Sequence, residues 1–170
     1  MQELHFLNSK EKREIIKSLT ETYGFSGALE GALLISQKEK RIYLLSGAEL
    51  LPDKADQELR IDKAGLYIGK MLPNGIQLNI EGSQLIGPYS SKHILELDDV
   101  HLELFVKGQD FDLSEKEFQS AAKGSDSEGA GESGIFIVKY KNDFLGSAII
   151  KNGKFQNCLS KSRWVKNLNR

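Results

Sequence analysis

Apolar residues at helical spacing define the first predicted element of the chain. Between Ile15 and Tyr23 they recur on one helix face, and charged residues occupy the positions between them. Asn8 followed three residues later by Glu11 is the capping-box pattern that begins a helix. Gly24 is typical of the left-handed residue that ends one. The sequence therefore predicts an amphipathic helix between Asn8 and Gly24.

Short apolar runs separated by polar residues predict two β-hairpins. The first spans residues 33–45 around a charged turn. The second joins residues 134–140 to residues 144–151 through a turn at Asn142-Asp143. A further turn is expected at Asn152-Gly153, because this dipeptide tolerates positive φ at both turn positions. These signals predict strands near both ends of the chain.

The middle of the chain is less regular. Ile76, Leu78 and Ile80 alternate with polar residues, as in a half-buried strand, and a short helix is expected at residues 82–86. Residues 98–107 fit a strand by their alternation and a helix by their capping residue Asp98. The pattern alone leaves both structures open for this segment.

Two polar stretches divide the chain. The first, at residues 53–58, marks a boundary between a helix-hairpin region, residues 1–58, and a second domain, residues 59–170. The second, residues 123–133, is small and polar, so nothing there offsets the entropy cost of ordering the backbone. We expect this segment to be a mobile surface loop.

Length and composition limit the class of protein. A chain of 170 residues with 39% hydrophobic residues is typical of one or two small globular domains. No apolar run approaches the roughly 18–20 residues that span a bilayer, so no membrane partner is expected. Cys158 is the single cysteine, which excludes an internal disulfide and makes the cytoplasm the expected location.

Charge is distributed unevenly along the chain. There are 23 lysines and arginines against 24 acidic residues, but residues 151–170 contain six cations and no carboxylate. Residues 1–150 therefore have 17 cations against 24 carboxylates, a net charge of −7 beside +6 in the C-terminal stretch. A basic segment of this kind is typical of proteins that bind a polyanion, because lysine and arginine neutralise phosphates. A basic terminus that is merely solvated fits the charge equally well.

The C-terminal motif resembles a known family. Phe144-Leu145-Gly146, followed by Asn157, Lys161 and Arg163, resembles the end of the PUA-like RNA-binding domain that closes the RsmF-type (NOL/NOP/Sun) RNA cytosine methyltransferases. Upstream, residues 64–70 and 104–111 resemble two further segments of that domain. A more distant likeness is to the Nip-type ribosome-assembly factors. The chain departs from the motif at Gln156, where the family has lysine, and at Ser160, where it has proline.

The resemblance implies both a fold and a function. The fold would be α+β, with a PUA-like β-barrel preceded by a small N-terminal α/β region, and residues 98–107 would be helical. The protein would bind structured rRNA or tRNA without catalysis, in RNA modification or ribosome assembly. Its protein partner would be a separate RNA methyltransferase or a ribosome-assembly factor. The alternative is a protein-interaction module that docks an acidic partner through the basic C-terminal surface.

The expected RNA-binding residues combine the basic stretch with one upstream strand. They are Lys70, Lys151, Lys154, Asn157, Lys161, Arg163 and Trp164. The cations would hold phosphates, and the asparagine would donate to the RNA backbone or a base. Trp164 would stack an unpaired base, or it would instead be a core residue that closes the last strand. The resemblance also implies that Lys70 and the Lys151–Arg163 cluster form one basic surface.

The remaining chemically active residues predict no enzyme, cofactor or metal. Residues 129–134 spell Gly-x-Gly-x-x-Gly, but a polar linker precedes them and a strand follows, which is the wrong context for a dinucleotide. The three histidines, at positions 5, 93 and 101, have no second ligand at metal spacing, and Asp98-Asp99 is interpreted as a helix start. Cys158 lies near Lys161 and Arg163, which would lower a thiol pKa, but no histidine follows it in the chain.

Overall fold

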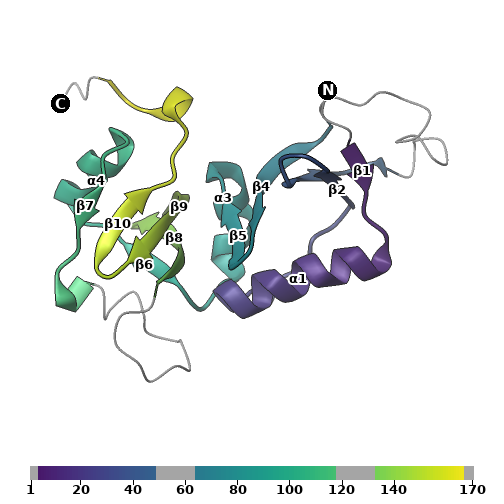
Figure 1. Cartoon of the computed structure of the whole chain (residues 1–170), viewed down its shortest axis with the longest axis horizontal. Coiled ribbons are helices and arrows are strands. Elements are labelled where there is room, and N and C mark those ends of the chain that lie inside the picture. Colours follow the sequence, from purple (N-terminus) through teal and green to yellow (C-terminus); the bar gives the residue numbers. More distant parts are fainter. Residues whose placement is uncertain (1–3, 49–63, 118–132, 167–170) are drawn as a thin grey trace.

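The computed structural model describes residues 4–48, 64–117 and 133–166, and it has an α+β fold with two five-stranded sheets. One of the sheets is curled into a half-barrel. Figure 1 shows the two sheets side by side, with α3 between them and α1 below the N-terminal sheet. The elements are β1 (Leu4–Phe6), α1 (Ser9–Tyr23), β2 (Ala32–Ser36), β3 (Arg41–Leu45), β4 (Leu66–Leu72), β5 (Gly75–Leu78), α3 (Ile80–Ile86), the 3₁₀ helix η2 (Gly87–Tyr89), β6 (Ile94–Glu96), α4 (Asp99–Val106), β7 (Phe111–Asp112), β8 (Gly134–Tyr140), β9 (Asp143–Lys151), β10 (Lys154–Asn157) and the 3₁₀ helix η3 (Lys161–Arg163).

The predicted N-terminal helix is confirmed as α1. The Asn8 side chain accepts hydrogen bonds from the backbone N–H groups of Lys10 and Glu11, and the Glu11 carboxylate accepts from the Asn8 N–H at 2.8 Å. Gly24 ends the helix with φ +62°. These contacts satisfy backbone donors that would otherwise lack partners at the start of the helix.

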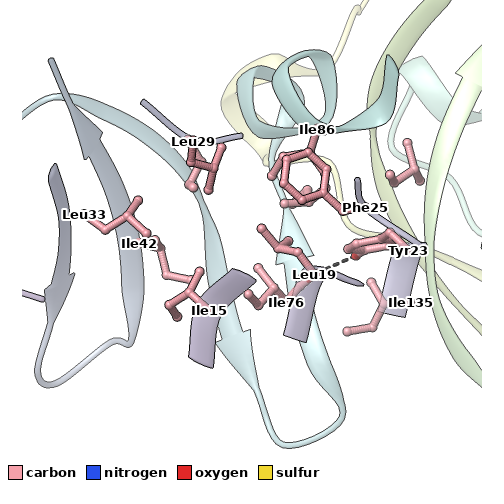
Figure 2. Packing of buried hydrophobic residues seen from close by; sticks show 13 residues of the cluster. Ile15, Leu19, Tyr23, Phe25, Leu29, Leu33, Ile42, Ile76, Ile86 and Ile135 are labelled. Carbon is pink, nitrogen blue, oxygen red and sulfur yellow. Dashed lines mark hydrogen bonds between the residues drawn. The ribbon is translucent and has the colours of Figure 1, made fainter. Parts of the chain in front are cut away.

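The helix packs its apolar stripe against the first sheet, whose strand order is β1-β2-β3-β4-β5. Ile15, Leu19 and Tyr23 are buried in a cluster with residues from β2 to β5 (Figure 2). The Tyr23 hydroxyl donates to the Ile76 carbonyl oxygen at 2.5 Å, so this buried polar group has a partner. Burial raises the pKa of Tyr23 above its ordinary value.

The second sheet has the order β6-β8-β9-β10-β7, in which β6 and β8 are parallel and the other pairs are antiparallel. Its strand β8 is buried on both faces. Ile135 and Ile137 belong to the core under α1, whereas Phe136 and Val138 belong to a second core with Phe105 of α4. This arrangement explains the unbroken apolar run of β8, and it packs the two sheets against each other.

Both predicted hairpins are confirmed, with a small change in one turn. The strands β8 and β9 are joined through Lys141 and Asn142, so Asp143 already belongs to β9. At the β9–β10 turn, Asn152 and Gly153 have φ values of +52° and +74°, as this type of turn requires. Phe144-Leu145-Gly146 lies inside β9, where the register with β8 shifts, and not in a turn before the strand.

The two expectations for the middle of the chain have different outcomes. The alternating strand ends at Leu78, because Asn79 caps α3 by accepting from the Gly82 N–H, and Ile80 begins that helix. Residues 99–106 are helical, as α4, with Asp98 accepting from the His101 N–H at 2.8 Å. The helical alternative for this segment is therefore confirmed.

The expected domain boundary and most of the expected mobile loop fall outside the described residues. The boundary after residue 58 lies within 49–63, and the strands that flank this gap, β3 and β4, are neighbours in the first sheet. The loop at 123–133 lies within the undescribed segment 118–132, except for its last residue. Among the described helices, none is long and apolar enough to cross a membrane.

Candidate functional site

The predicted basic residues of the C-terminal stretch separate into two groups. Lys151 and Lys154 are opposite each other at the turn between β9 and β10. Lys161 and Arg163 belong to η3, which lies beyond the other end of β10 (Figure 1). The predicted Lys151–Arg163 cluster therefore has two parts, which β10 separates.

The hairpin group, Lys151 and Lys154, lies beside acidic residues. Lys154 is directly opposite Asp112 of β7, and Asp110 and Asp112 line the same shallow hollow as the two lysines. Both lysines are exposed. The neighbouring carboxylates oppose the attraction of this group for an anionic ligand.

Asn157 is engaged within the protein. Its side-chain N–H groups donate to the Phe105 carbonyl oxygen at 2.8 Å and to the Gln109 carbonyl oxygen at 3.3 Å. Its side-chain oxygen accepts from the Leu159 N–H at 2.8 Å. The side chain that was expected to contact RNA therefore joins the end of β10 to the end of α4.

Residues 158–166, which we call the tail, are held against α4 by Trp164. The indole N–H donates to the Leu159 carbonyl oxygen at 3.1 Å, and the ring lies so close to Gly108 that a Cβ there would be 2.0 Å from Trp164 Cε2. The Val165 N–H also donates to Val106. Trp164 follows η3 and is 37% exposed, so the expectation of a core tryptophan closing the last strand is wrong.

A pocket of about 290 Å³ lies where the tail passes between the two sheets. Arg163 closes one side of it by an ion pair with Glu81 of α3. Cys158 and the hydroxyls of Ser160 and Ser162 line it from the tail. The other lining residues are Tyr67, Gln77, Leu78, Asn79, Ile80, Gly146, Ser147 and Leu159. The pocket thus carries a guanidinium, amides and hydroxyls, which can all form hydrogen bonds with a polar ligand.

Lys70 lies in the first sheet next to Gln77, a residue that lines the pocket. It is directly opposite Arg41 on one side and Gln77 on the other, and residues that face each other across a sheet point to the same face. Lys70 and Gln77 point to the outer face of the sheet, because Ile76, the residue before Gln77, points to the core and successive side chains of a strand point to opposite faces. Sequence reasoning missed Arg41, whose guanidinium lies 5.7 Å from the centre of the Tyr67 ring.

The Cys158 thiol is less acidic than the sequence suggested. Burial raises its pKa from the usual value near 9 to about 11. Lys161 and Arg163 were expected to lower this pKa, and that expectation is wrong, because burial and the nearby Asp110 carboxylate raise it. The thiol is protonated at neutral pH.

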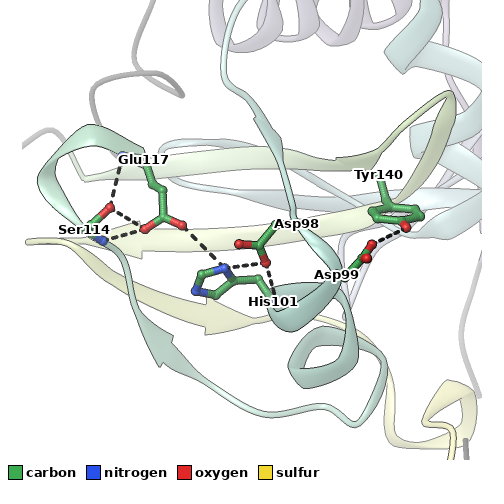
Figure 3. A network of polar contacts seen from close by, with 6 residues as sticks. All are labelled: Asp98, Asp99, His101, Ser114, Glu117 and Tyr140. Carbon is green, nitrogen blue, oxygen red and sulfur yellow. Dashed lines mark hydrogen bonds and ion pairs between the residues drawn. The ribbon is translucent and has the colours of Figure 1, made fainter.

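A second group of polar residues lies at the N-terminal end of α4. Figure 3 shows Asp98, His101 and Glu117 pointing toward one another. The expectation that His101 is isolated is wrong: its Nδ1 is 2.9 Å from Asp98 Oδ1 and 3.4 Å from Glu117 Oε1. The first contact was accessible from the sequence, since residues three apart on a helix are neighbours. The second joins segments that only the fold brings together.

The comparisons with known proteins leave the function open. No protein-family model matches the chain, and no curated protein matches it significantly. The functional argument therefore rests on the geometry of the tail, the pocket and the first sheet.

Proposed function

We propose that this protein binds structured RNA through a surface that joins the outer face of the first sheet to the tail across the pocket. The observation that carries this proposal is the position of the cations. Lys70 is directly opposite Gln77, which lines the pocket, and Arg163 lines it from the tail. Arg41 lies on the other side of Lys70 in the sheet and forms an ion pair with Glu39 at 2.7 Å. The tail adds the exposed Lys161 and Lys166 and has no carboxylate of its own.

The chemistry of this surface suits RNA. Lys70 and the cations of the tail would contact phosphates, which supply much of the affinity of a nucleic-acid complex and make it salt-dependent. Trp164 keeps part of its ring exposed, and the Lys161 ammonium lies 5.9 Å from the ring centre. An exposed aromatic beside cations can stack an unpaired base. The hydroxyls and amides of the pocket suit the polar edges of RNA.

The family resemblance extends the proposal to the biological setting. The second domain is proposed to be PUA-like, since the residues of the motif lie in β9, in β10 and in the tail that follows them. The ligand would be rRNA or tRNA in the cytoplasm, and the protein would act without catalysis in RNA modification or ribosome assembly. A separate methyltransferase or assembly factor would be its partner.

The test is an anisotropy titration of labelled tRNA and rRNA fragments with the full chain, at two salt concentrations. The variant Lys70→Glu, Lys161→Glu, Arg163→Glu reverses charges around the pocket, and Lys151→Glu, Lys154→Glu is the matched control at the hairpin. We expect affinity that falls with salt, a loss of about 100-fold or more in the first variant, and a loss of about threefold or less in the control.

Cys158 provides a second readout, because it lines the pocket and is the only cysteine. Bound RNA should slow its alkylation, and nuclease protection should map the contacted nucleotides. The proposal is abandoned if RNA does not bind, or if the two variants lose equal affinity. Binding of an acidic polypeptide that RNA cannot displace would instead establish the protein-interaction alternative.

A further inference from the structure

Two carboxylates and an imidazole meet at the N-terminal end of α4, whereas the tail contacts Val106 and Gly108 at the other end of this helix. Asp98 and His101 come from the N-terminal turn of α4, and Glu117 comes from a separate segment after β7. One ligand atom from each lies within 4.8 Å of the others. The His101 Nδ1 lies between the two carboxylates (Figure 3).

We propose that Asp98, His101 and Glu117 bind a divalent transition-metal ion of the Zn²⁺ or Mn²⁺ class. Ligand atoms that bond to such an ion at about 2.0–2.2 Å are themselves about 2.9–3.5 Å apart. The separations of Nδ1 from the two carboxylate oxygens, 2.9 and 3.4 Å, fall in this range. Only the two oxygens must approach each other, and the Asp98 side chain is exposed enough to turn.

The local charge balance favours a cation over a proton. In the described part of the chain, neither Asp98 nor Glu117 forms an ion pair with a lysine or arginine. The Nδ1 that faces both carboxylates carries at most one proton, so even a charged His101 leaves the group with one net negative charge. A divalent ion would neutralise both carboxylates and accept the imidazole nitrogen as a ligand.

Neighbouring residues hold the ligands in position. The Ser114 N–H and hydroxyl both donate to Glu117 Oε2, at 2.8 and 2.5 Å, which leaves Oε1 directed at His101. The ring of Phe111 packs on the imidazole with the ring centres 4.7 Å apart. Such supporting contacts orient the ligands of protein metal sites. Asp99 is not part of the group, because its side chain is directed at Tyr140, whose hydroxyl donates to it (Figure 3).

The chemical types of the three ligands favour one class of metal ion. The imidazole favours transition metals over Mg²⁺ and Ca²⁺, which prefer oxygen ligands alone.

The test is isothermal titration calorimetry of the metal-stripped full chain with Zn²⁺ and with Mn²⁺, using Mg²⁺ and Ca²⁺ as comparison ions. The ligand variants are Asp98→Asn, His101→Gln and Glu117→Gln. The first keeps the helix cap, because asparagine caps as well as aspartate, so its loss of binding cannot be attributed to unfolding of α4. The matched control is His5→Gln, which removes a histidine that also faces a carboxylate, that of Glu11 at 3.6 Å.

We expect one Zn²⁺ to bind per chain. The affinity for Zn²⁺ should fall about tenfold or more in each ligand variant and stay unchanged in His5→Gln. Ser114→Ala should lower this affinity roughly tenfold, which is the size of effect that supporting contacts have at metal sites. The imidazole resonances of His101 should shift in NMR spectra during the titration. The proposal is overturned if no ion saturates the protein, if His101→Gln binds as well as wild type, or if Mg²⁺ binds as tightly as Zn²⁺. These outcomes are independent of RNA binding, since the two sites share no residue.

Discussion

The two ends of the C-terminal stretch carry similar charge but are held in different ways. At the hairpin, the ladder between β9 and β10 sets the positions of Lys151 and Lys154, and Asp110 and Asp112 lie beside them. The tail is not part of either β-sheet. Side chains hold it instead: the Asn157 amide, the Trp164 ring on Gly108 and the Arg163–Glu81 ion pair.

This difference shows that a basic residue in the sequence is not always available to an anionic ligand, because a nearby carboxylate can offset its charge. The hairpin lysines are rigidly placed but partly offset by carboxylates from another part of the chain. The tail cations have only one carboxylate partner in the described residues, Glu81, and they adjoin a pocket. Each anchor of the tail can be removed singly, which makes the comparison testable.

The largest effect is expected from Gly108→Ala. Gly108 has φ +74°, and an added Cβ would overlap the Trp164 ring, so the tail must detach. Gly153→Ala at the hairpin is the matched control, because it has the same φ of +74° but only an ordinary contact, 3.7 Å from the Leu113 oxygen. We expect Gly108→Ala to lower the free energy of unfolding by about 3 kcal/mol and Gly153→Ala by about 1 kcal/mol.

Urea denaturation measures both changes, and the fluorescence of Trp164, the only tryptophan, reports the detachment directly. Its emission should shift to the red in Gly108→Ala and stay unchanged in Gly153→Ala. Equal destabilisation with unchanged emission in both variants would show that the ring does not anchor the tail.

The next effect is expected from Asn157→Ala. This change leaves the Phe105 carbonyl and the Leu159 N–H without their partner, and we expect a loss of about 2 kcal/mol in urea denaturation. Asn142→Ala, in the exposed turn between β8 and β9, should change stability by less than about 0.5 kcal/mol. RNA affinity should fall only in the first variant, because the tail loses its attachment to α4. Similar stability in the two variants would contradict an anchoring role for Asn157.

A smaller effect follows from the thiol of Cys158. Its pKa in the folded protein, about 11, exceeds the unfolded value near 9, so the unfolded chain loses its proton first as the pH rises. The thiol's contribution to stability is therefore complete below pH 9 and is lost between about pH 9 and 11. A difference of about two pKa units corresponds to at most about 2.7 kcal/mol, and the partial exposure of the thiol reduces the loss to about 2 kcal/mol or less.

Cys158→Ala isolates this contribution, because Tyr23 and the other alkaline groups titrate in both proteins. The difference in free energy of unfolding between the two proteins should shrink as the pH rises through this window. A difference that is constant with pH would place the thiol in solvent.

The smallest effect is expected from Glu81→Gln. Glu81 competes with a phosphate for Arg163, and an exposed pair of this kind contributes about 0.2–1 kcal/mol, so RNA should bind about threefold tighter. The control Glu21→Gln removes an equal charge from the Lys17–Glu21 pair on α1 and should leave affinity unchanged. Equal tightening in both variants would indicate a general charge effect and not a local one.

Much of the fold was predictable wherever neighbours in the sequence decide the structure. The capping box of α1 and the positive φ values of Asn152 and Gly153 depend on residues within three or four positions, and both were predicted correctly. Ile80 was predicted to lie in a strand because it continues the alternation of Ile76 and Leu78, but Asn79 caps a helix that begins at Ile80. Residues 98–107 could not be decided from their pattern, since alternation and a cap indicated opposite structures.

The candidate sites were less predictable. The sequence proposes Lys161, Arg163 and Trp164 as RNA-binding residues together with Lys151 and Lys154, but it does not show the distance between the two groups. Arg41 was missed because cross-strand register is not visible in a linear pattern. Glu117 was missed as a neighbour of His101 because the two residues belong to different segments.

The sequence by itself determined α1 with its caps, the two hairpins, and the net positive charge of the C-terminal stretch, because these depend on local backbone preferences and on composition. Only the tertiary structure decided which of those charges lie beside carboxylates, which border a pocket, and which carboxylates meet a histidine. Coulomb interactions and hydrogen bonds depend on distance in space, and residues far apart in the chain, such as Glu81 and Arg163, become neighbours only when the two sheets pack together.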